Sequence, residues 1–418
     1  MTARYIATDR PIDSRTMSNA PSDQSQPGSF RIVDLFAGPG GLDLAAEVLD
    51  IPSIGIEWDD DAVATRLAAG LPTEPGDVRL FGPGNPGFED CNVLAGGPPC
   101  QTFSIAGSGS GRKALDLVTG FIHRMHAWYE REKAGKRGET WEDIQRELDK
   151  LDDERTGLVL QPLRWVFEAM LRPRHGGETP KPFDVIVLEQ VPAVIEVWHA
   201  YEKVLRAVGY KTHAKVFHTE QYGVPQTRRR AVLVARHEDF PKHFLPPTHQ
   251  QYRKGVVPAE LLFAGGRGPW VSMAGALNEV YEQVAGVRRR AMPFCVVSNY
   301  GSGGNPKARG RRASDEPSAT ITGKWKRNRI VSVDPRETEM DRLSNEEAGV
   351  FQSFPYRYPW RGNDQAQQVG NAVPPRFGVH VLSAALDLDP PGDDTWERLV
   401  CWAPEPADPS DQDVDASA

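Results

Sequence analysis

Cysteine is scarce in this sequence, and its spacing excludes several classes of site. The 418 residues include four cysteines, with no C-x-x-C pair and no histidine cluster, so we expect no zinc site. No stretch of roughly 18 apolar residues could cross a membrane, and the first residues are charged where a secretory signal would be apolar. We therefore expect free thiols in the reducing cytoplasm and no membrane partner.

An excess of basic residues is also lacking, but the charges are unevenly distributed. The net charge of −8 argues against a general nucleic-acid-binding protein. However, residues 288–329 hold eleven Lys and Arg against two acids, and residues 387–418 hold ten acids against one Arg. The basic block is either a solvated face or a phosphate-binding surface. The Pro-rich, acidic end is typical of disorder.

Short apolar runs alternate with glycine turns and helical patterns in the first half of the chain. A strand is predicted from about residue 30 to 36, followed by a helix pattern, and further strands at "SIGIEW" and "FDVIVLEQV". The last run has no polar alternation, which is typical of a strand buried on both faces. This repetition predicts a doubly wound, mostly parallel α/β sheet with its chemistry at the carboxyl ends of the strands.

The sequence "FAGPGG" lies between the first predicted strand and helix. Gly38, Gly40 and Gly41 would let the backbone approach a ligand closely, and Glu57 ends the next strand about twenty residues on, where it could bind a ribose diol. A tight turn without a ligand has the same pattern. NAD, FAD and S-adenosylmethionine would all suit this loop.

The sequence "AGGPPCQTFS" places Cys100 directly after two prolines. A free cysteine is usually a small buried hydrophobe. However, the Gly-Gly-Pro-Pro segment cannot be helical, so a rigid loop presents this thiol. Cys100 is therefore a candidate nucleophile as well as a candidate core residue.

Five motifs in order give the sequence a specific resemblance. "DLFAGPGG", "GGPPCQTFS", "LEQV", "QYGVPQTRRR" and "QVGNAVPP" resemble the ordered motif set of DNA (cytosine-5)-methyltransferases, over about residues 31–380. The resemblance implies a Rossmann-like fold with a smaller target-recognition domain. It implies methyl transfer from S-adenosylmethionine to C5 of a flipped-out cytosine in double-stranded DNA.

The resemblance assigns the catalytic roles to four residues. Cys100 would add to C6 of the cytosine and so make C5 nucleophilic. Glu189 would bind N3 and the exocyclic amine. Arg228 and Arg230 would lie on one face of a strand, one donating to O2 and the other bracing the catalytic groups and phosphate. The family usually has Glu-Asn-Val where this chain has Glu189-Gln190-Val191, so the hydrogen bonds within the loop after Glu189 must differ from those of the family.

The resemblance also implies the ligand contacts. Phe36 and Trp58 would sandwich the adenine, with Asp77 near its amine and Leu158 beneath it. No metal is expected. The implied cofactor-binding residues are Phe36, Gly38, Gly40, Gly41, Glu57, Trp58, Asp77, Val78, Gly97, Pro99, Leu158 and Asn371. The implied DNA-binding residues are Gln101, Ser104, Arg311, Arg312 and Lys324.

The expected domain boundaries follow from composition and from this resemblance. They are a disordered leader (1–29), a catalytic cofactor-binding domain (30–236) with a charged surface insertion (111–152), an irregular target-recognition domain (237–345), a hinge and return to the catalytic domain (346–388) and an acidic tail (389–418).

Three other functions remain open. The tRNA-methylating branch of the family carries a Cys-Phe-Thr tripeptide that is absent here. A catalytically silent DNA-binding homologue would not need the four catalytic residues. A nicotinamide-dependent oxidoreductase would explain only the glycine loop. The expected partners are double-stranded DNA and a cognate restriction endonuclease acting on the same site, and the expected state is a monomer.

Overall fold

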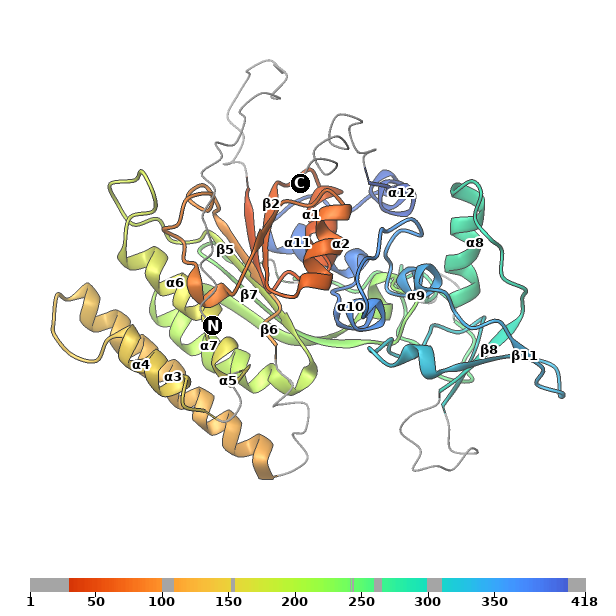
Figure 1. The fold of residues 1–418 in the computed structure, drawn as a ribbon, viewed down its shortest axis with the longest axis horizontal. Coiled ribbons are helices and arrows are strands. Elements are labelled where there is room, and N and C mark those ends of the chain that lie inside the picture. Colours follow the sequence, from red (N-terminus) through yellow and green to blue (C-terminus); the bar gives the residue numbers. More distant parts are fainter. Residues whose placement is uncertain are drawn as a thin grey trace, which may run out of the picture.

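A seven-stranded sheet forms the centre of the protein in the computed structural model (Figure 1), with strand order β3-β2-β1-β4-β5-β7-β6. All neighbouring strands are parallel except β7, which runs antiparallel to β5 and β6. The predicted doubly wound, mostly parallel sheet is confirmed. The strands are β1 (Ile32–Leu35), β2 (Ser53–Glu57), β3 (Thr73–Pro75), β4 (Val93–Gly96), β5 (Val185–Gln190), β6 (Lys211–His218) and β7 (Arg229–Arg236). The structure describes residues 30–99, 109–151, 155–240, 242, 244–258, 265–298 and 310–404.

Helices cover both faces of this sheet because alternate strand residues point to opposite sides. On β4, Val93 and Ala95 join the core beneath α1 and α11, whereas Leu94 joins the core beneath α3, α6 and α7. The three layers are visible in Figure 1. Glycine allows α1 and α11 to pack closely, since a Cβ on Gly378 would lie 2.9 Å from that of Ala45. The helices are α1 (Gly41–Glu47), α2 (Asp60–Ala68), α3 (Gly109–Lys133), α5 (Arg155–Leu158), α6 (Gln161–Leu171), α7 (Ile195–Ala207) and α11 (Pro375–Ala385).

The expected surface insertion at 111–152 was wrong for most of α3. The side chains of Phe121, Met125 and Trp128 are buried against the sheet-covering helices, so this helix belongs to the core. Its charged residues occupy only the outer face, which is why the sequence resembles a surface element. The surface insertion is limited to the helical hairpin formed by the end of α3 and by α4 (Trp141–Leu148).

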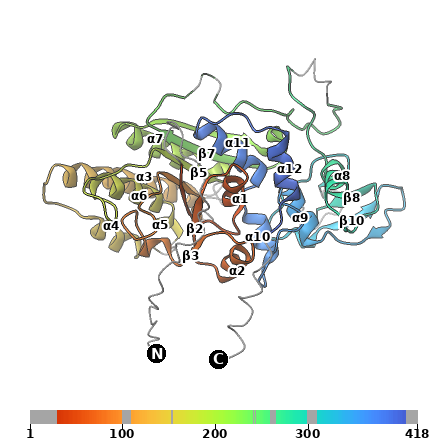
Figure 2. The same cartoon turned by 90° about the horizontal axis from the view of Figure 1, so that it is seen from above.

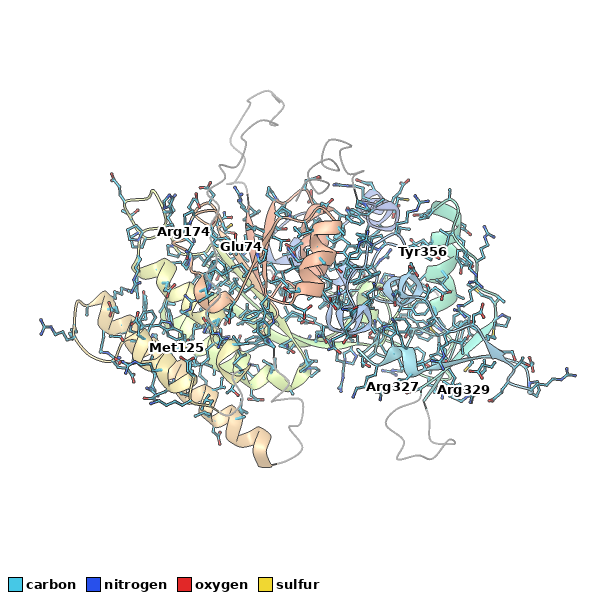
Figure 3. All side chains as sticks on the ribbon, viewed as in Figure 1. Glu74, Met125, Arg174, Arg327, Arg329 and Tyr356 are labelled. Atoms are coloured by element: carbon cyan, nitrogen blue, oxygen red, sulfur yellow. The ribbon has the colours of Figure 1, made fainter. Side chains whose placement is uncertain are left out.

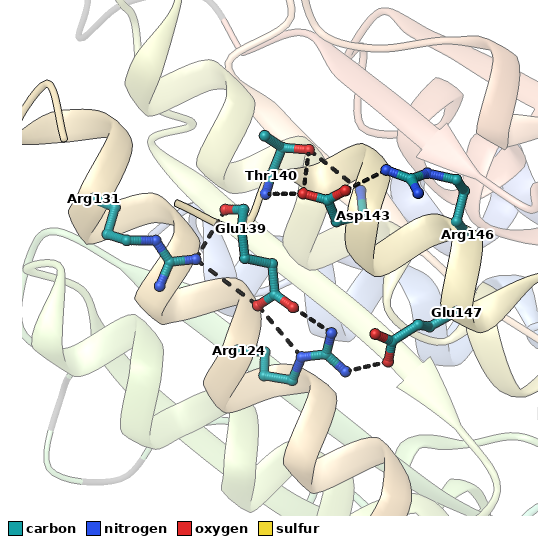
Figure 4. Close-up of polar contacts among 7 residues, drawn as sticks. All are labelled: Arg124, Arg131, Glu139, Thr140, Asp143, Arg146 and Glu147. Carbon is teal, nitrogen blue, oxygen red and sulfur yellow. Dashed lines mark hydrogen bonds and ion pairs between the residues drawn. The ribbon is translucent and has the colours of Figure 1, made fainter. Parts of the chain in front are cut away.

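Ion pairs and a helix cap hold this hairpin together (Figure 4). Arg124 of α3 binds Glu147 of α4 at 2.6 Å and also pairs with Glu139 in the connecting loop. Thr140 caps α4 in a reciprocal capping box with Asp143. The charged sequence pattern is therefore a set of contacts within the hairpin.

The region expected to be irregular contains a second sheet. Its antiparallel strands, in the order β11-β10-β8-β9, lie with α8 beside the main sheet (Figures 1 and 2). Each of these strands has four residues or fewer, which is too short to give an apolar alternation, so the sequence does not reveal them. The elements are α8 (Met273–Gln283), β8 (Phe294–Val297), β9 (Arg311–Ala313), β10 (Arg329–Ser332) and β11 (Glu339–Met340).

The chain then returns to the main sheet through α9 (Asn345–Phe351), α10 (Gln365–Asn371) and α11. Within the expected acidic tail (389–418), residues Asp393–Cys401 form the helix α12. Leu399 of α12 is buried in the core, and Arg398 binds Asp50, just after α1, with two contacts of 2.8 Å on the surface. The leader 1–29 and the last residues, 405–418, lie outside the described residues.

Candidate active site

A cavity of about 420 Å³ lies at the carboxyl edge of the main sheet. The ends of β1, β2, β4 and β5 meet there because these strands are parallel. Strand order reverses between β1 and β4, and such switch points are the usual ligand sites of doubly wound sheets. The volume suits a nucleotide-sized ligand.

The glycine loop forms one wall of this cavity. Phe36 and Gly38 line it, and both have left-handed backbone conformations, with φ of 62° and 56°. A phenylalanine rarely adopts such a φ, which marks the loop as strained. Gly40 and Gly41 do not line the cavity. They allow close packing instead, since a Cβ on Gly41 would lie 2.1 Å from the carbonyl oxygen of Val373.

Glu57 joins the glycine loop to the start of α2. Its Oε2 accepts the N–H of Gly38 at 2.7 Å, and its Oε1 accepts the N–H groups of Trp58 at 2.9 Å and Asp59 at 2.8 Å. Burial raises the pKa of Glu57, although these N–H groups oppose the rise. Three of about four acceptor positions are thus used within the protein. The indole of Trp58 is 64% exposed beside the cavity, where it could stack on a planar ring.

Besides Gly40 and Gly41, three more expected cofactor contacts lie outside the cavity lining: Asp77, Val78 and Leu158. The carboxylate of Asp77 is bound by the guanidinium of Arg79 at 2.6 Å. Burial favours a higher pKa for Asp77, but the bonds to Arg79 outweigh it and hold the pKa below its ordinary value. Val78 and Leu158 are buried in the core on that side of the sheet. A ligand that contacts Asp77 would therefore have to break its ion pair with Arg79 or bind beside that pair.

The cysteine loop leaves β4 beside the end of β5. Gly97 and Pro99 line the cavity, while Cys100, Gln101 and Ser104 lie outside the described residues. The Gln190 side chain holds this segment, because its Nε2 donates to the carbonyl oxygen of Pro98 at 2.8 Å. The Gln190 Oε1 accepts the N–H of Val191. Gln190 thus ties the segment before Cys100 to the end of β5.

Glu189 and Arg230 form an ion pair in the cavity wall. Glu189 Oε1 lies 2.7 Å from Arg230 Nε, and their side chains are 15% and 11% exposed. Burial raises the pKa of Glu189, while the charges of Arg230 and Arg228 oppose the rise. The site therefore holds a poorly solvated carboxyl group whose proton affinity depends on two neighbouring cations, as is common for catalytic acids and bases.

Arg228 is buried next to this pair but does not line the cavity. Its guanidinium donates to the carbonyl oxygens of Ile321 at 3.0 Å, Gly370 at 2.9 Å and Ala372 at 3.1 Å. Burial holds the pKa of Arg228 well below its usual value. Arg228 and Arg230 are both buried, and Arg229 between them is exposed, as alternation along a strand requires. Arg228 joins three segments around the site.

The returning C-terminal segment closes the cavity on the side of the first helix. Asn371 of α10 lines it and accepts a hydrogen bond from Gln367 at 3.0 Å. Val373 and Phe377 add apolar lining. Residues far apart in sequence therefore share one cavity wall.

The three described residues expected to bind DNA have different surroundings. Arg311 pairs with Glu337 at 2.7 Å on the surface. Arg312 donates to Tyr252 at 2.6 Å and lies over its ring at 4.4 Å. Lys324 is exposed before the 3₁₀ turn η6 (Trp325–Arg327), near Arg327 and Arg329, which are labelled in Figure 3. Exposed cations thus lie around η6.

Sequence reasoning missed Asp34, which ends β1 and lines the cavity although it is only 4% exposed. A carboxyl group inside the apolar "RIVDLF" run was the available signal. Among the described residues, no cluster of three or more His, Cys, Asp and Glu could hold a metal ion. No helix in the described part of the chain is long and apolar enough to span a bilayer.

The sequence profile of the C-5 cytosine-specific DNA methylase family matches residues 30–122 and 181–386. The chain belongs to this family. The unmatched segment between these ranges contains the hairpin formed by the end of α3 and by α4.

Curated relatives cover most of the chain. The "Type II methyltransferase M1.HphI" of Haemophilus parahaemolyticus is 26% identical over 86% of this chain and 88% of its own length. The "Type II methyltransferase M.NgoFVII" of Neisseria gonorrhoeae is 24% identical over 90% of both chains.

Solved structures share the fold. The Dnmt2 methyltransferase of S. pombe has a TM-score of 0.50 at 15% identity, covering 86% of this chain and 98% of its own. The Entamoeba histolytica methyltransferase EhMeth has a TM-score of 0.51 at 12% identity, covering 86% of this chain and 99% of its own. The protein is accordingly a DNA cytosine-5 methyltransferase with a Rossmann-like fold.

Proposed function

We propose that the protein uses S-adenosylmethionine and a covalent Cys100 adduct to methylate C5 of a flipped-out cytosine in a specific double-stranded DNA sequence. The single observation that carries this proposal is that one cavity contains both the glycine loop with Glu57 and the Glu189–Arg230 pair. A nucleotide-type cofactor and a reacting base would therefore meet within one site.

The residues of the cavity fit the cofactor. The strained loop at Phe36 and Gly38 brings backbone close to the ligand, and the remaining acceptor position of Glu57 suits a ribose hydroxyl. Trp58 offers an exposed ring for the adenine. When bound, the cofactor supplies an electrophilic methyl group on a sulfonium.

Each catalytic group has a chemical task. The thiolate of Cys100 adds to C6 of the cytosine, which moves electron density to C5. Glu189 hydrogen-bonds N3 and the exocyclic amine and stabilises the charge that develops on the ring, and Arg230 orients Glu189 and donates to O2. After methylation, loss of the C5 proton lets the thiolate leave C6. Arg228 braces the site through three carbonyl groups.

The second sheet and its basic surroundings would recognise the DNA. Arg311, Lys324 and the cations around η6 would contact phosphates and groove edges. We also infer a cytoplasmic monomer that acts on the same sequence as a partner restriction endonuclease, since the relatives named above are Type II methyltransferases of bacteria.

Bisulfite sequencing of DNA from cells that express the chain tests this proposal. In DNA from cells with the wild type, one cytosine of a short recognition sequence should be fully protected from bisulfite conversion wherever that sequence occurs. This protection should be lost with Cys100→Ser. Protection of tRNA cytosines with unprotected DNA would favour the RNA-methylating branch. No protection in either, together with tight DNA binding, would favour a silent DNA-binding homologue.

A further inference from the structure

Two carboxyl groups meet beneath the cofactor side of the cavity. Asp34 ends β1 and lines the cavity, and Asp43 lies in the first turn of α1. They are 4% and 1% exposed, and the negative charge of Asp43 acts on Asp34. Two neighbouring carboxyl groups that are buried away from water oppose each other's ionisation, which favours a proton on one of them.

One cation lies with this pair, and its contacts favour Asp43. Arg66 of α2 is fully buried, and its Nη1 binds Asp43 Oδ2 at 2.6 Å. Its Nε donates to the hydroxyl of Thr73 at 3.0 Å and its Nη2 to the carbonyl oxygen of Pro72 at 3.0 Å. Arg66 therefore neutralises Asp43, which leaves Asp34 as the carboxyl group that must be neutral or stay unbalanced.

The other groups that face Asp34 do not balance it. Glu57, at the end of β2, adds a further negative charge, and the buried Tyr358 hydroxyl, which lies near Arg66 and Asp43, donates to the carbonyl oxygen of Pro39. Burial raises the pKa of Asp34 well above its usual value, and the charges of Asp43 and Glu57 raise it further. Arg66 opposes this rise but does not cancel it.

We propose that Asp34 carries a proton and releases it when the sulfonium of S-adenosylmethionine occupies the cavity. Asp34 is then a positioning residue that makes the site prefer the charged cofactor over the uncharged product, S-adenosylhomocysteine. This inference rests on the proposed function.

The physical basis is linkage between two charges. A nearby cation favours the ionised form of a carboxyl group, commonly by about 1–3 pKa units within ~4–6 Å. Ligands that differ in charge must therefore differ in the protons that they displace, and ionised Asp34 must bind the cation more tightly. Once the methyl group has been transferred, Asp34 takes up a proton again, and the site binds the remaining S-adenosylhomocysteine less tightly than it bound the charged cofactor.

Titration calorimetry of the full chain tests the proposal in buffers that differ in ionisation enthalpy, at neutral and mildly alkaline pH. We expect S-adenosylmethionine to release more protons than S-adenosylhomocysteine, because the two differ only in the methyl group and its charge. Asp34→Asn mimics the neutral acid, so it should abolish the difference in proton release and reduce the affinity ratio of the two ligands severalfold. Asp59→Asn is the matched control, since Asp59 also lines the cavity but is exposed. It should retain the proton release.

Thermal unfolding provides a second readout that needs no ligand. The pKa of Asp34 is raised in the folded state, so Asp34 holds its proton more tightly in the folded protein than in the unfolded chain, and its contribution to stability is lost as pH rises from about 4 through its raised pKa. The Tm of Asp34→Asn minus the Tm of the wild type should therefore increase as pH rises from 4 to 8. The same difference for Asp59→Asn should stay constant.

Equal proton release with both ligands in the wild type would overturn the proposal and leave the proposed function intact. A difference that persists in Asp34→Asn would assign the proton to another group and also overturn it. Failure of both ligands to bind the wild type would instead contradict the proposed cofactor.

Discussion

Gln190 should position the loop that carries Cys100, and its substitution measures how much that positioning contributes to the reaction. The amide of Gln190 donates to the Pro98 carbonyl oxygen at 2.8 Å and accepts from the Val191 N–H. Pro98 is buried, so loss of the donor leaves its carbonyl oxygen without this partner. An unsatisfied buried carbonyl group costs about 1–3 kcal/mol. If this cost appears in the transition state, the rate falls about 5- to 150-fold.

Single-turnover methyl transfer to cognate DNA is the appropriate assay, because product release does not limit it. Gln190→Met keeps the side-chain volume and removes both hydrogen bonds, so it should show the full loss. Gln190→Asn restores the usual residue of the family and should lose less than tenfold (about 1.4 kcal/mol). Wild-type rates in Gln190→Met would refute the positioning role. A loss in Gln190→Asn as large as that in Glu189→Gln would show that this loop differs from the family more than we infer.

Three further predictions follow from the site. Glu189→Gln should lose most single-turnover activity but retain DNA affinity in a filter-binding assay, because it keeps the shape and loses the exchangeable proton; unchanged activity would remove Glu189 from the mechanism. Glu57→Ala should weaken S-adenosylmethionine binding by calorimetry and also lower Tm, because three main-chain N–H groups lose their acceptor; an unchanged Tm would contradict the second part. Neutralising Arg311 or Lys324 should reduce the log–log salt slope of DNA binding by about one unit per phosphate contact, with little change in Tm. Arg312→Ala should also lower Tm, because Arg312 packs on Tyr252. DNA binding that is unchanged at every salt concentration would exclude these contacts.

The sequence predicts the central strands of the main sheet well because each of them is a short, largely apolar run, whereas β3 and β6 have no such pattern. The predicted runs that end at Phe36, Glu57 and Val191 correspond closely to β1, β2 and β5. Parallel strands then require their carboxyl ends to meet, so residues from separate motifs are expected in one site. The cavity contains Phe36, Glu57, Glu189 and Arg230 together for this reason.

The remaining features depend on contacts that periodicity does not encode. α3 has a charged outer face and a buried inner face, and only its packing against α6 and α7 distinguishes it from a surface helix. The position of α12 depends on the burial of Leu399 in the core and on contacts between distant residues, such as Arg398 with Asp50, which is 348 residues away. Asp34 and Asp43 also belong to a polar network that only the folded chain assembles.

Covalent trapping tests the central claim most directly. Cognate DNA with 5-fluorocytosine at the target position should form a complex with the wild type and S-adenosylmethionine that survives denaturing electrophoresis, because fluorine at C5 cannot leave as a proton. Cys100→Ser should form no such complex and should still bind S-adenosylmethionine. A trapped complex in Cys100→Ser, or none in a wild type that methylates ordinary DNA, would contradict attack by Cys100 on C6.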